Sequence, residues 1–285
     1  MTPSARAHTA QDELSARLAD LAYRGGASLV ALLPEATARG LGRAVAHVCW
    51  HLSPRRRTRL MQNLKRLLPD LDARALGRAS RAAFGGFGES VVDTLRLSRA
   101  GGLDVEERVR FEGWERFEQA LADGGVILLG AHAGNWEWAG AALARRGVPV
   151  VAPVRRHRGA ERFFSAFRKR FGVRTHGRLA PLIAHGKEPR VLALFLDRAV
   201  EGRSTARPAR LALGAVALAA RRGWSLLPAL CLREGTSYRI VFGPRLRPSP
   251  SRVARAHDAR AALAFLETQL KAHRGQWFAF ESLES

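Results

Sequence analysis

The sequence predicts an α/β protein, with a mostly parallel central sheet flanked by helices and a helical extension before it. Two observations lead to this prediction. After about residue 126, short aliphatic runs alternate with amphipathic segments, which indicates βαβ units and a parallel sheet. Before residue 126, apolar residues recur mostly at helical spacing. We therefore expect a helical region over residues 1–100 and an α/β domain over residues 101–285 that forms one integrated unit.

The individual elements follow from the same patterns. In the helical region, breaks are expected at LLPD (67–70) and at the glycines of FGGFGES (84–90). In the α/β part, the last two aliphatic runs lie close enough in sequence to be neighbouring strands. Helices are predicted over 11–23, 27–51, 72–95, 137–146, 160–171, 207–222 and 253–273, and strands over 126–130, 148–154, 191–196, 225–232 and 238–243.

Composition and charge limit the classes of partner. The chain has 285 residues, of which 47% are hydrophobic, enough for a sizeable core. Its 47 Lys and Arg against 25 Asp and Glu give a net charge of +22, which implies an anionic partner: phospholipid, nucleic acid or an acidic carrier protein. A nucleic-acid-binding protein should show a reading module or interleaved exposed aromatics, and neither is present. Cys49 and Cys231 are far apart, so reduced thiols and a cytosolic exposure are expected.

Residues 26–52 are the part of the chain most similar to a membrane segment. No run of eighteen apolar residues predicts a spanning helix, and the charged start does not resemble a signal peptide. Arg39, Arg43 and His47 recur every four positions and form one helical stripe between apolar residues, and SPRRRTRL (53–60) adds a basic cluster. This pattern fits a helix lying in the interface of an anionic membrane, or a helix packed on the core with a solvated polar face.

A second amphipathic segment covers residues 159–171. Four phenylalanines lie on one helical face, and four basic residues oppose them. A buried face with a solvated basic back explains this pattern, although the basic back could also meet phospholipid or acyl carrier protein. The two sets are Phe163, Phe164, Phe167 and Phe171, and Arg162, Arg168, Lys169 and Arg170.

The stretch ILLGAHAGNWEWAG (127–140) carries the candidate chemistry. Ligands of parallel sheets bind where strands end and helices begin, and His132 follows the first predicted strand there, with Gly134 and Asn135 suited to a turn and a helix start. If His132 precedes the helix and Glu137 lies in its first turn, the carboxylate can reach one imidazole nitrogen. The pair would then take a proton from a hydroxyl, unless the histidine is only structural.

Other chemistries lack their sequence signals. No second histidine stands at metal-ligand spacing from His132, so a metal site is not expected. The chain has no G-x-S-x-G nucleophile elbow, no phosphate-binding P-loop and no dinucleotide fingerprint, so neither a serine hydrolase nor a nucleotide cofactor is predicted.

GAHAGNWEWAG (130–140) resembles the H-x-x-x-x-[DE] block of the glycerolipid acyltransferase superfamily. Its H-x-G-N-W-[DE] form is that of the bacterial lipid A biosynthesis lauroyl/myristoyl acyltransferase family, and the phosphatidylinositol mannoside acyltransferases share it. Further similar segments follow in the same order, so that the resemblance extends over residues 34–280. They are RRRTRLMQNLKRLLPDL (55–71), VAPVRRHRGAERFFSAFRKRFG (151–172), VLALFLDRA (191–199), ARPARLALGAVALAARRGWSLLPAL (206–230) and QWFAFES (276–282).

The resemblance implies a function and a set of site residues. It implies transfer of an acyl group from acyl carrier protein or CoA to a hydroxyl of a lipid A precursor or of another glycolipid, on the cytoplasmic face of the inner membrane and without a cofactor. His132 would be the general base and Glu137 its orienting carboxylate. The other candidates are Arg155 and Arg156 as positive partners of the donor, Asn135 as a turn residue, and Asp197 as a holder of a loop or an arginine.

Departures from the family pattern concern the substrates. Arg198 stands where the family usually has glutamine, residues 204–206 (STA) replace a Phe-Phe-Gly-like turn, and the chain ends in ESLES in place of a basic, aromatic segment. These departures leave the chemistry intact and concern the acyl chain and the acceptor. A family member that binds lipid without turnover is a separate alternative, and an activity assay distinguishes it from an enzyme.

Overall fold

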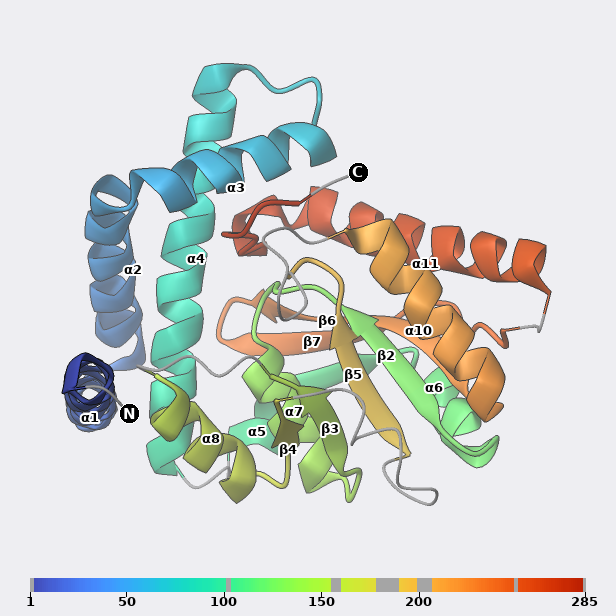
Figure 1. Cartoon of the computed structure of the whole chain (residues 1–285), viewed down its shortest axis with the longest axis horizontal. Helices are drawn as coiled ribbons and strands as arrows, with labels where there is room; N and C mark the ends of the chain where they lie inside the picture. Colours follow the sequence, from blue (N-terminus) through green and yellow to red (C-terminus); the bar gives the residue numbers. More distant parts are fainter. Residues whose placement is uncertain are drawn as a thin grey trace.

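The computed structural model describes residues 3–100, 104–154, 160–177, 190–198, 207–248 and 251–283. Figure 1 shows a twisted central sheet with helices on both faces and a separate group of helices along one side. The sheet has the strand order β1-β7-β6-β2-β5-β3-β4. The predicted α/β fold with a mostly parallel sheet is confirmed. The strands are β1 Val109–Glu112, β2 Val126–Gly130, β3 Val150–Pro153, β4 Arg174–His176, β5 Val191–Phe195, β6 Ser225–Glu234 and β7 Ser237–Phe242.

Strand β2 lies at the centre of the sheet and positions the candidate site. It pairs in parallel with β5 on one side and β6 on the other, and β6 and β7 form the antiparallel neighbours that the sequence predicted. All of β2 is buried because both sheet faces are covered: Ile127 and Leu129 join one core cluster, and Val126 and Leu128 join the other.

The helices of the α/β part cover these two faces. The first cluster is closed by α10 Pro208–Arg222 and α11 Arg252–Ala272, and the second by α6 Trp114–Ala122, α7 Trp136–Arg145 and α8 Glu161–Arg170. Helix α6 and the preceding α5 Asp104–Arg108 and β1 lie before residue 126, so a β-α unit occupies part of the region read as mostly helical. Strand β4 was also not predicted, since three residues are too few for a period-2 pattern.

The N-terminal helices are α1 Pro3–Leu32, α2 Glu35–Leu52, α3 Pro54–Leu67 and α4 Ala73–Ala100. The predicted break between the first two helices is displaced: α1 continues through Gly25 and Gly26, and the chain turns only at Pro34. In Figure 1, α2 runs beside α4 and α3 crosses its upper part.

The predicted break of α4 at FGGFGES is wrong, because α4 is continuous there. These glycines instead permit close packing. A Cβ on Gly88 would collide with the backbone oxygen of Gly42 in α2, and one on Gly86 would lie 2.5 Å from the backbone oxygen of Gly275. The cost of glycine inside a helix is thus offset by the close approach of neighbouring backbones.

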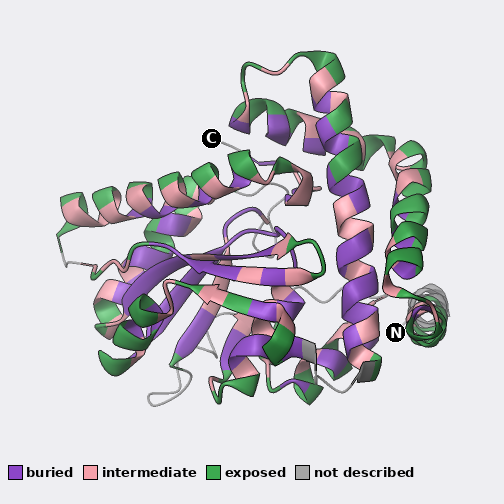
Figure 2. Ribbon diagram, turned by 180° about the vertical axis from the view of Figure 1, so that it is seen from behind, coloured by how far each residue is buried: buried purple, intermediate pink, exposed green. Residues whose placement is uncertain are grey.

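The arginines of the polar stripe on α2 face the protein, and not the solvent. Its Arg39 donates to both carboxylate oxygens of Asp93 in α4, at 2.8 and 3.0 Å, and its Arg43 binds the buried Glu89 of α4. The apolar side is exposed instead, with Leu41, Val45, Val48 and Leu52 all more than 40% accessible. Figure 2 shows this exposed outer side of α2. Within the described residues, no helix combines the length and apolarity needed to cross a membrane.

Candidate active site

The segment between β2 and α7 forms a tight turn that ends in a capped helix. Gly134 has a φ of +61°, and a Cβ there would overlap the backbone oxygen of Cys231 in β6, so only glycine fits. The backbone N–H of Asn135 donates to that Cys231 oxygen at 2.9 Å. The Asn135 side chain accepts from the N–H of Trp138 at 3.3 Å and caps α7. The predicted turn and helix start are confirmed.

Helix α4 holds this turn from the other side. Asn135 donates from Nδ2 to the backbone oxygen of Ser90 at 3.0 Å and to Oγ1 of Thr94 at 3.1 Å, while the Ser90 hydroxyl donates to the backbone oxygen of Gly134 at 2.9 Å. Since all of these groups are buried, leaving any of them unpaired would be costly. The position of the turn is therefore fixed by polar contacts as well as by packing.

His132 is bound by a carboxylate from the neighbouring strand. Its Nδ1 lies 2.7 Å from Oδ1 of Asp197, and its backbone N–H donates to Oδ2 of Asp197 at 2.8 Å. This arrangement follows from the register, because Gly130 of β2 pairs with Phe195 of β5 and the two side chains stand two residues beyond that pair. The parallel strands thus place His132 and Asp197 at the same edge of the sheet.

A third group completes this contact. The indole Nε1 of Trp277 donates to Oδ2 of Asp197 at 2.9 Å, and the backbone N–H of Phe278 donates to the backbone oxygen of His132 at 2.8 Å. Burial alone would raise the pKa of the Asp197 carboxyl, but the charge of His132 and the hydrogen bonds from His132 and Trp277 outweigh burial and lower it. Asp197 is therefore an ionised acceptor at neutral pH.

The ionised carboxylate decides which imidazole nitrogen can accept a proton. Because Oδ1 of Asp197 can only accept, Nδ1 of His132 is the donor of their hydrogen bond, and Nε2 keeps its lone pair. Nε2 forms no hydrogen bond with the described part of the chain, and the imidazole has Trp136 and Phe195 as aromatic neighbours, with ring centroids 5.0 and 4.7 Å away. The arrangement suits a general base beside an apolar wall.

Glu137 has a different partner from the one expected. The described structure pairs it with Arg168 of α8, whose Nε donates to both carboxylate oxygens at 3.0 and 3.1 Å and whose Nη2 donates to Oε1 at 2.5 Å. Nε1 of Trp136 donates to the same Oε1 at 3.2 Å. Glu137 therefore ties α7 to α8 and holds the indole beside His132, while the hydrogen bond expected between His132 and Glu137 is replaced by that with Asp197.

The other predicted residues have mixed outcomes. Arg155 and Arg156 lie outside the described residues. Asp197 was expected to hold a loop or an arginine, and its strand-end position could have identified it as the partner of His132. Trp277, 80 positions further on, lies in the QWFAFES segment of the resemblance, but nothing in the sequence indicated its contact with Asp197. In the helix over 159–171 the phenylalanine face is buried as predicted, except that Phe164 is half-buried, whereas Arg168 on the supposedly solvated back is mostly buried against Glu137.

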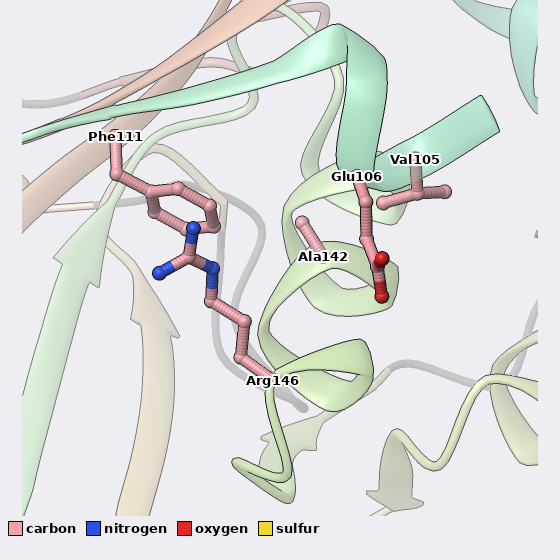
Figure 3. A pocket seen from close by; sticks show the side chains of 5 residues that line it. All are labelled: Val105, Glu106, Phe111, Ala142 and Arg146. Atoms are coloured by element: carbon pink, nitrogen blue, oxygen red, sulfur yellow. The ribbon is translucent and has the colours of Figure 1, made fainter. Parts of the chain in front are cut away.

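The described residues offer little else that could hold a ligand near His132. No group of three His, Cys, Asp or Glu side chains there could hold a metal ion. A pocket of about 260 Å³, drawn in Figure 3, lies at the far end of α7 from His132. Arg146 lines it and stacks over the ring of Phe111 at 4.3 Å. The pocket is lined by Val105, Glu106, Phe111, Ala142 and Arg146, so His132 is not among its lining residues.

Comparison with known proteins gives the family. A search of curated proteins found no match. The sequence model of the bacterial lipid A biosynthesis acyltransferases matches residues 9–283, nearly the whole chain. That family comprises membrane-associated enzymes with an acyl donor and a lipid acceptor. With this match added to the α/β fold and to the histidine at the end of its central strand, the chain belongs to the bacterial lipid A biosynthesis acyltransferase family.

Proposed function

We propose that the chain moves a fatty acyl group from a thioester, carried by acyl carrier protein or by CoA, to a hydroxyl of a lipid A precursor or a similar glycolipid. The observation that carries this proposal is the buried carboxylate of Asp197 on Nδ1 of His132, which leaves Nε2 as the acceptor of a proton. A hydroxyl is a weak nucleophile at neutral pH, so a base at this position supplies what the reaction needs.

The steps balance without an acyl-enzyme. Nε2 of His132 removes the proton of the acceptor hydroxyl as its oxygen attacks the thioester carbonyl carbon. The tetrahedral intermediate then expels the thiolate, which takes the proton back from the imidazolium, so an ester forms and a thiol is released. Asp197 stabilises the imidazolium between these steps through its negative charge.

The remaining site residues act around this pair. Asn135 holds the turn that carries His132, and Glu137 acts through Arg168 and Trp136 as a positioning residue. We assign Arg155 and Arg156, which follow β3, to the donor phosphate or the developing oxyanion. The phosphate and the oxyanion are both anionic, so a guanidinium group stabilises either of them. A purified Arg155→Ala variant should lose more turnover than Arg156→Ala.

The exposed apolar side of α2 supports attachment to the cytoplasmic face of the inner membrane. Four large apolar side chains on one helix face favour insertion into the lipid interface, and the net charge of +22 favours anionic headgroups. Val45→Glu with Val48→Glu should abolish flotation with anionic vesicles, whereas Val253→Glu, on a still more exposed valine of α11, should not. Equal flotation of both variants would contradict this attachment.

An acyl-transfer assay with the purified chain tests the reaction itself. Lipid product is measured by mass spectrometry from an acyl thioester and a lipid A precursor, with a phosphatidylinositol mannoside as the second acceptor. His132→Ala should lose most of the roughly 10²–10⁴-fold that a general base contributes. His257→Ala is the matched control, since His257 is exposed on α11. A folded His132→Ala variant as active as the control would overturn the proposal.

A further inference from the structure

The outer side of α3 and the first part of α4 form a strongly basic surface. Between residues 55 and 81 the chain has nine Lys or Arg and two Asp, which is one basic residue in three, whereas the whole chain has 47 in 285. Seven of these arginines are exposed, and one of them, Arg66, donates to the backbone oxygen of Leu283. Within the described structure, none of the other six has an acidic partner. We name them the α3–α4 basic surface: Arg55, Arg56, Arg59, Arg74, Arg78 and Arg81.

The two helices present these arginines side by side. The indole of Trp50, at the end of α2, lies between them, because Arg57 of α3 and Arg81 of α4 both place their guanidinium carbon 4.7 Å from its ring. On α4 the exposed arginines recur at spacings of four and three, which puts them on one helix face. The basic residues therefore make one continuous surface.

The inner side of α3 leads directly to the catalytic pair. Asn63 donates to the backbone oxygens of Ala279 and Glu281 at 2.9 and 2.7 Å. The same C-terminal segment contributes the indole that binds Asp197 and the N–H that binds the backbone of His132. Hence only the C-terminal segment would separate a partner bound on α3 from the reacting atoms.

This surface has a different chemistry from that of a lipid-binding face. Among the described residues, the large exposed apolar side chains of the N-terminal helices lie on α1 and α2, and neither α3 nor the first half of α4 has one. Trp50, the aromatic that could anchor an interface, is held within the protein by its two arginines and by a hydrogen bond from Nε1 to Ser80 at 3.1 Å. In Figure 1, α3 also crosses α4, whereas α2 runs beside it.

We propose that the α3–α4 basic surface docks an acidic carrier protein that brings the acyl thioester to His132 on a flexible arm. The inference rests on the proposed acyl transfer and selects between its two donors. Six exposed guanidinium groups along two helices match a protein surface of acidic side chains, whereas the phosphates of a single CoA could engage only a few of them.

Charge reversal on α3 tests the docking. The variant Arg55→Glu with Arg59→Glu leaves the Trp50 stack intact, and Arg221→Glu with Arg260→Glu makes the same charge change on exposed residues of α10 and α11. Binding of fluorescently labelled acyl carrier protein is measured by anisotropy at low salt, and folding by circular dichroism. We expect roughly tenfold weaker binding for the α3 variant, a smaller salt dependence, and little change for the control.

Two further measurements on the same proteins separate the outcomes. Acyl transfer from the carrier should show a raised KM with an unchanged kcat, transfer from acyl-CoA should be unaffected, and flotation with anionic vesicles should stay normal. Equal carrier binding by both variants would overturn the docking site, and so would a loss confined to flotation, which would make it a lipid surface. If the unaltered chain binds the carrier but transfers no acyl group, the proposed reaction fails while the docking site stands.

Discussion

Asp197 and Glu137 are two buried carboxylates, of which Asp197 binds His132 directly and Glu137 binds Trp136, a neighbour of His132. Asp197 is approached by donors only, two of them from His132 itself, and it follows β5 at the sheet edge. Glu137 lies in the first turn of α7 and binds an arginine from α8. The first can hold an imidazolium by charge, whereas the second is already neutralised by its guanidinium. Proximity in sequence to His132 is thus a weaker guide to its carboxylate partner than the register of neighbouring strands.

The largest effect is expected for Asp197→Asn. If the amide oxygen accepts from the backbone of His132 and from Trp277, the amide NH₂ faces Nδ1 and forces the proton onto Nε2, which then cannot act as a base. We expect kcat to fall by about 10²-fold or more, with the substrate KM little changed. Single-turnover kinetics on folded protein check this, and a near-normal rate would remove Asp197 from the mechanism.

Glu137→Gln should cost less, about tenfold in kcat/KM, because it weakens the anchoring of Trp136 and α8 but leaves the pair with Asp197 intact. Arg168→Gln should have a similar effect. The double variant should be no worse than either single one, since both changes break the same contact. The pH dependence of kcat should stay that of the unaltered enzyme. A shifted pH profile, or a loss equal to that of Asp197→Asn, would show that Glu137 acts directly on His132.

A smaller effect is expected for Trp277→Phe, which keeps the ring and removes one of the donors to Asp197. One hydrogen bond to a buried charged group contributes about 1.5–3 kcal/mol to stability. Urea unfolding at pH 7 should show a loss of that order, together with a fall in kcat of only a few-fold. An unchanged free energy of unfolding would mean that the indole contributes packing alone.

The smallest effect concerns pH. The pKa of Asp197 is lowered in the folded state, so its carboxylate stabilises the fold above the ordinary value of 3.8, and this contribution is lost as the pH falls through the lowered pKa. The difference in unfolding free energy between the unaltered chain and Asp197→Asn should therefore narrow below about pH 4. A difference that grows on acidification would contradict the direction of the shift.

The sequence predicted the sheet well, because aliphatic runs buried on both faces leave a strong signal, as in residues 126–130. It failed where tertiary contacts decide. Glycine propensity predicted a break in α4, but the packing of Gly88 on Gly42 keeps the helix continuous. The spacing of His132 and Glu137 predicted a contact between them, but the Glu137 carboxylate binds Arg168 instead. The role of Trp277 arises only when the end of the chain folds back over the central strand.

The unbroken course of α4 has a geometric consequence. Within residues 89–94, less than two helical turns, Glu89 and Asp93 of α4 bind α2. Ser90 and Thr94 in the same stretch bind the loop beside His132. Two packed helices have axes about 8–10 Å apart, and a helix is stiff over so short a length. The distance between the imidazole of His132 and the outer side of α2 is therefore fixed. An enzyme resting on lipid through α2 would sample acceptor hydroxyls at one height above the acyl chains.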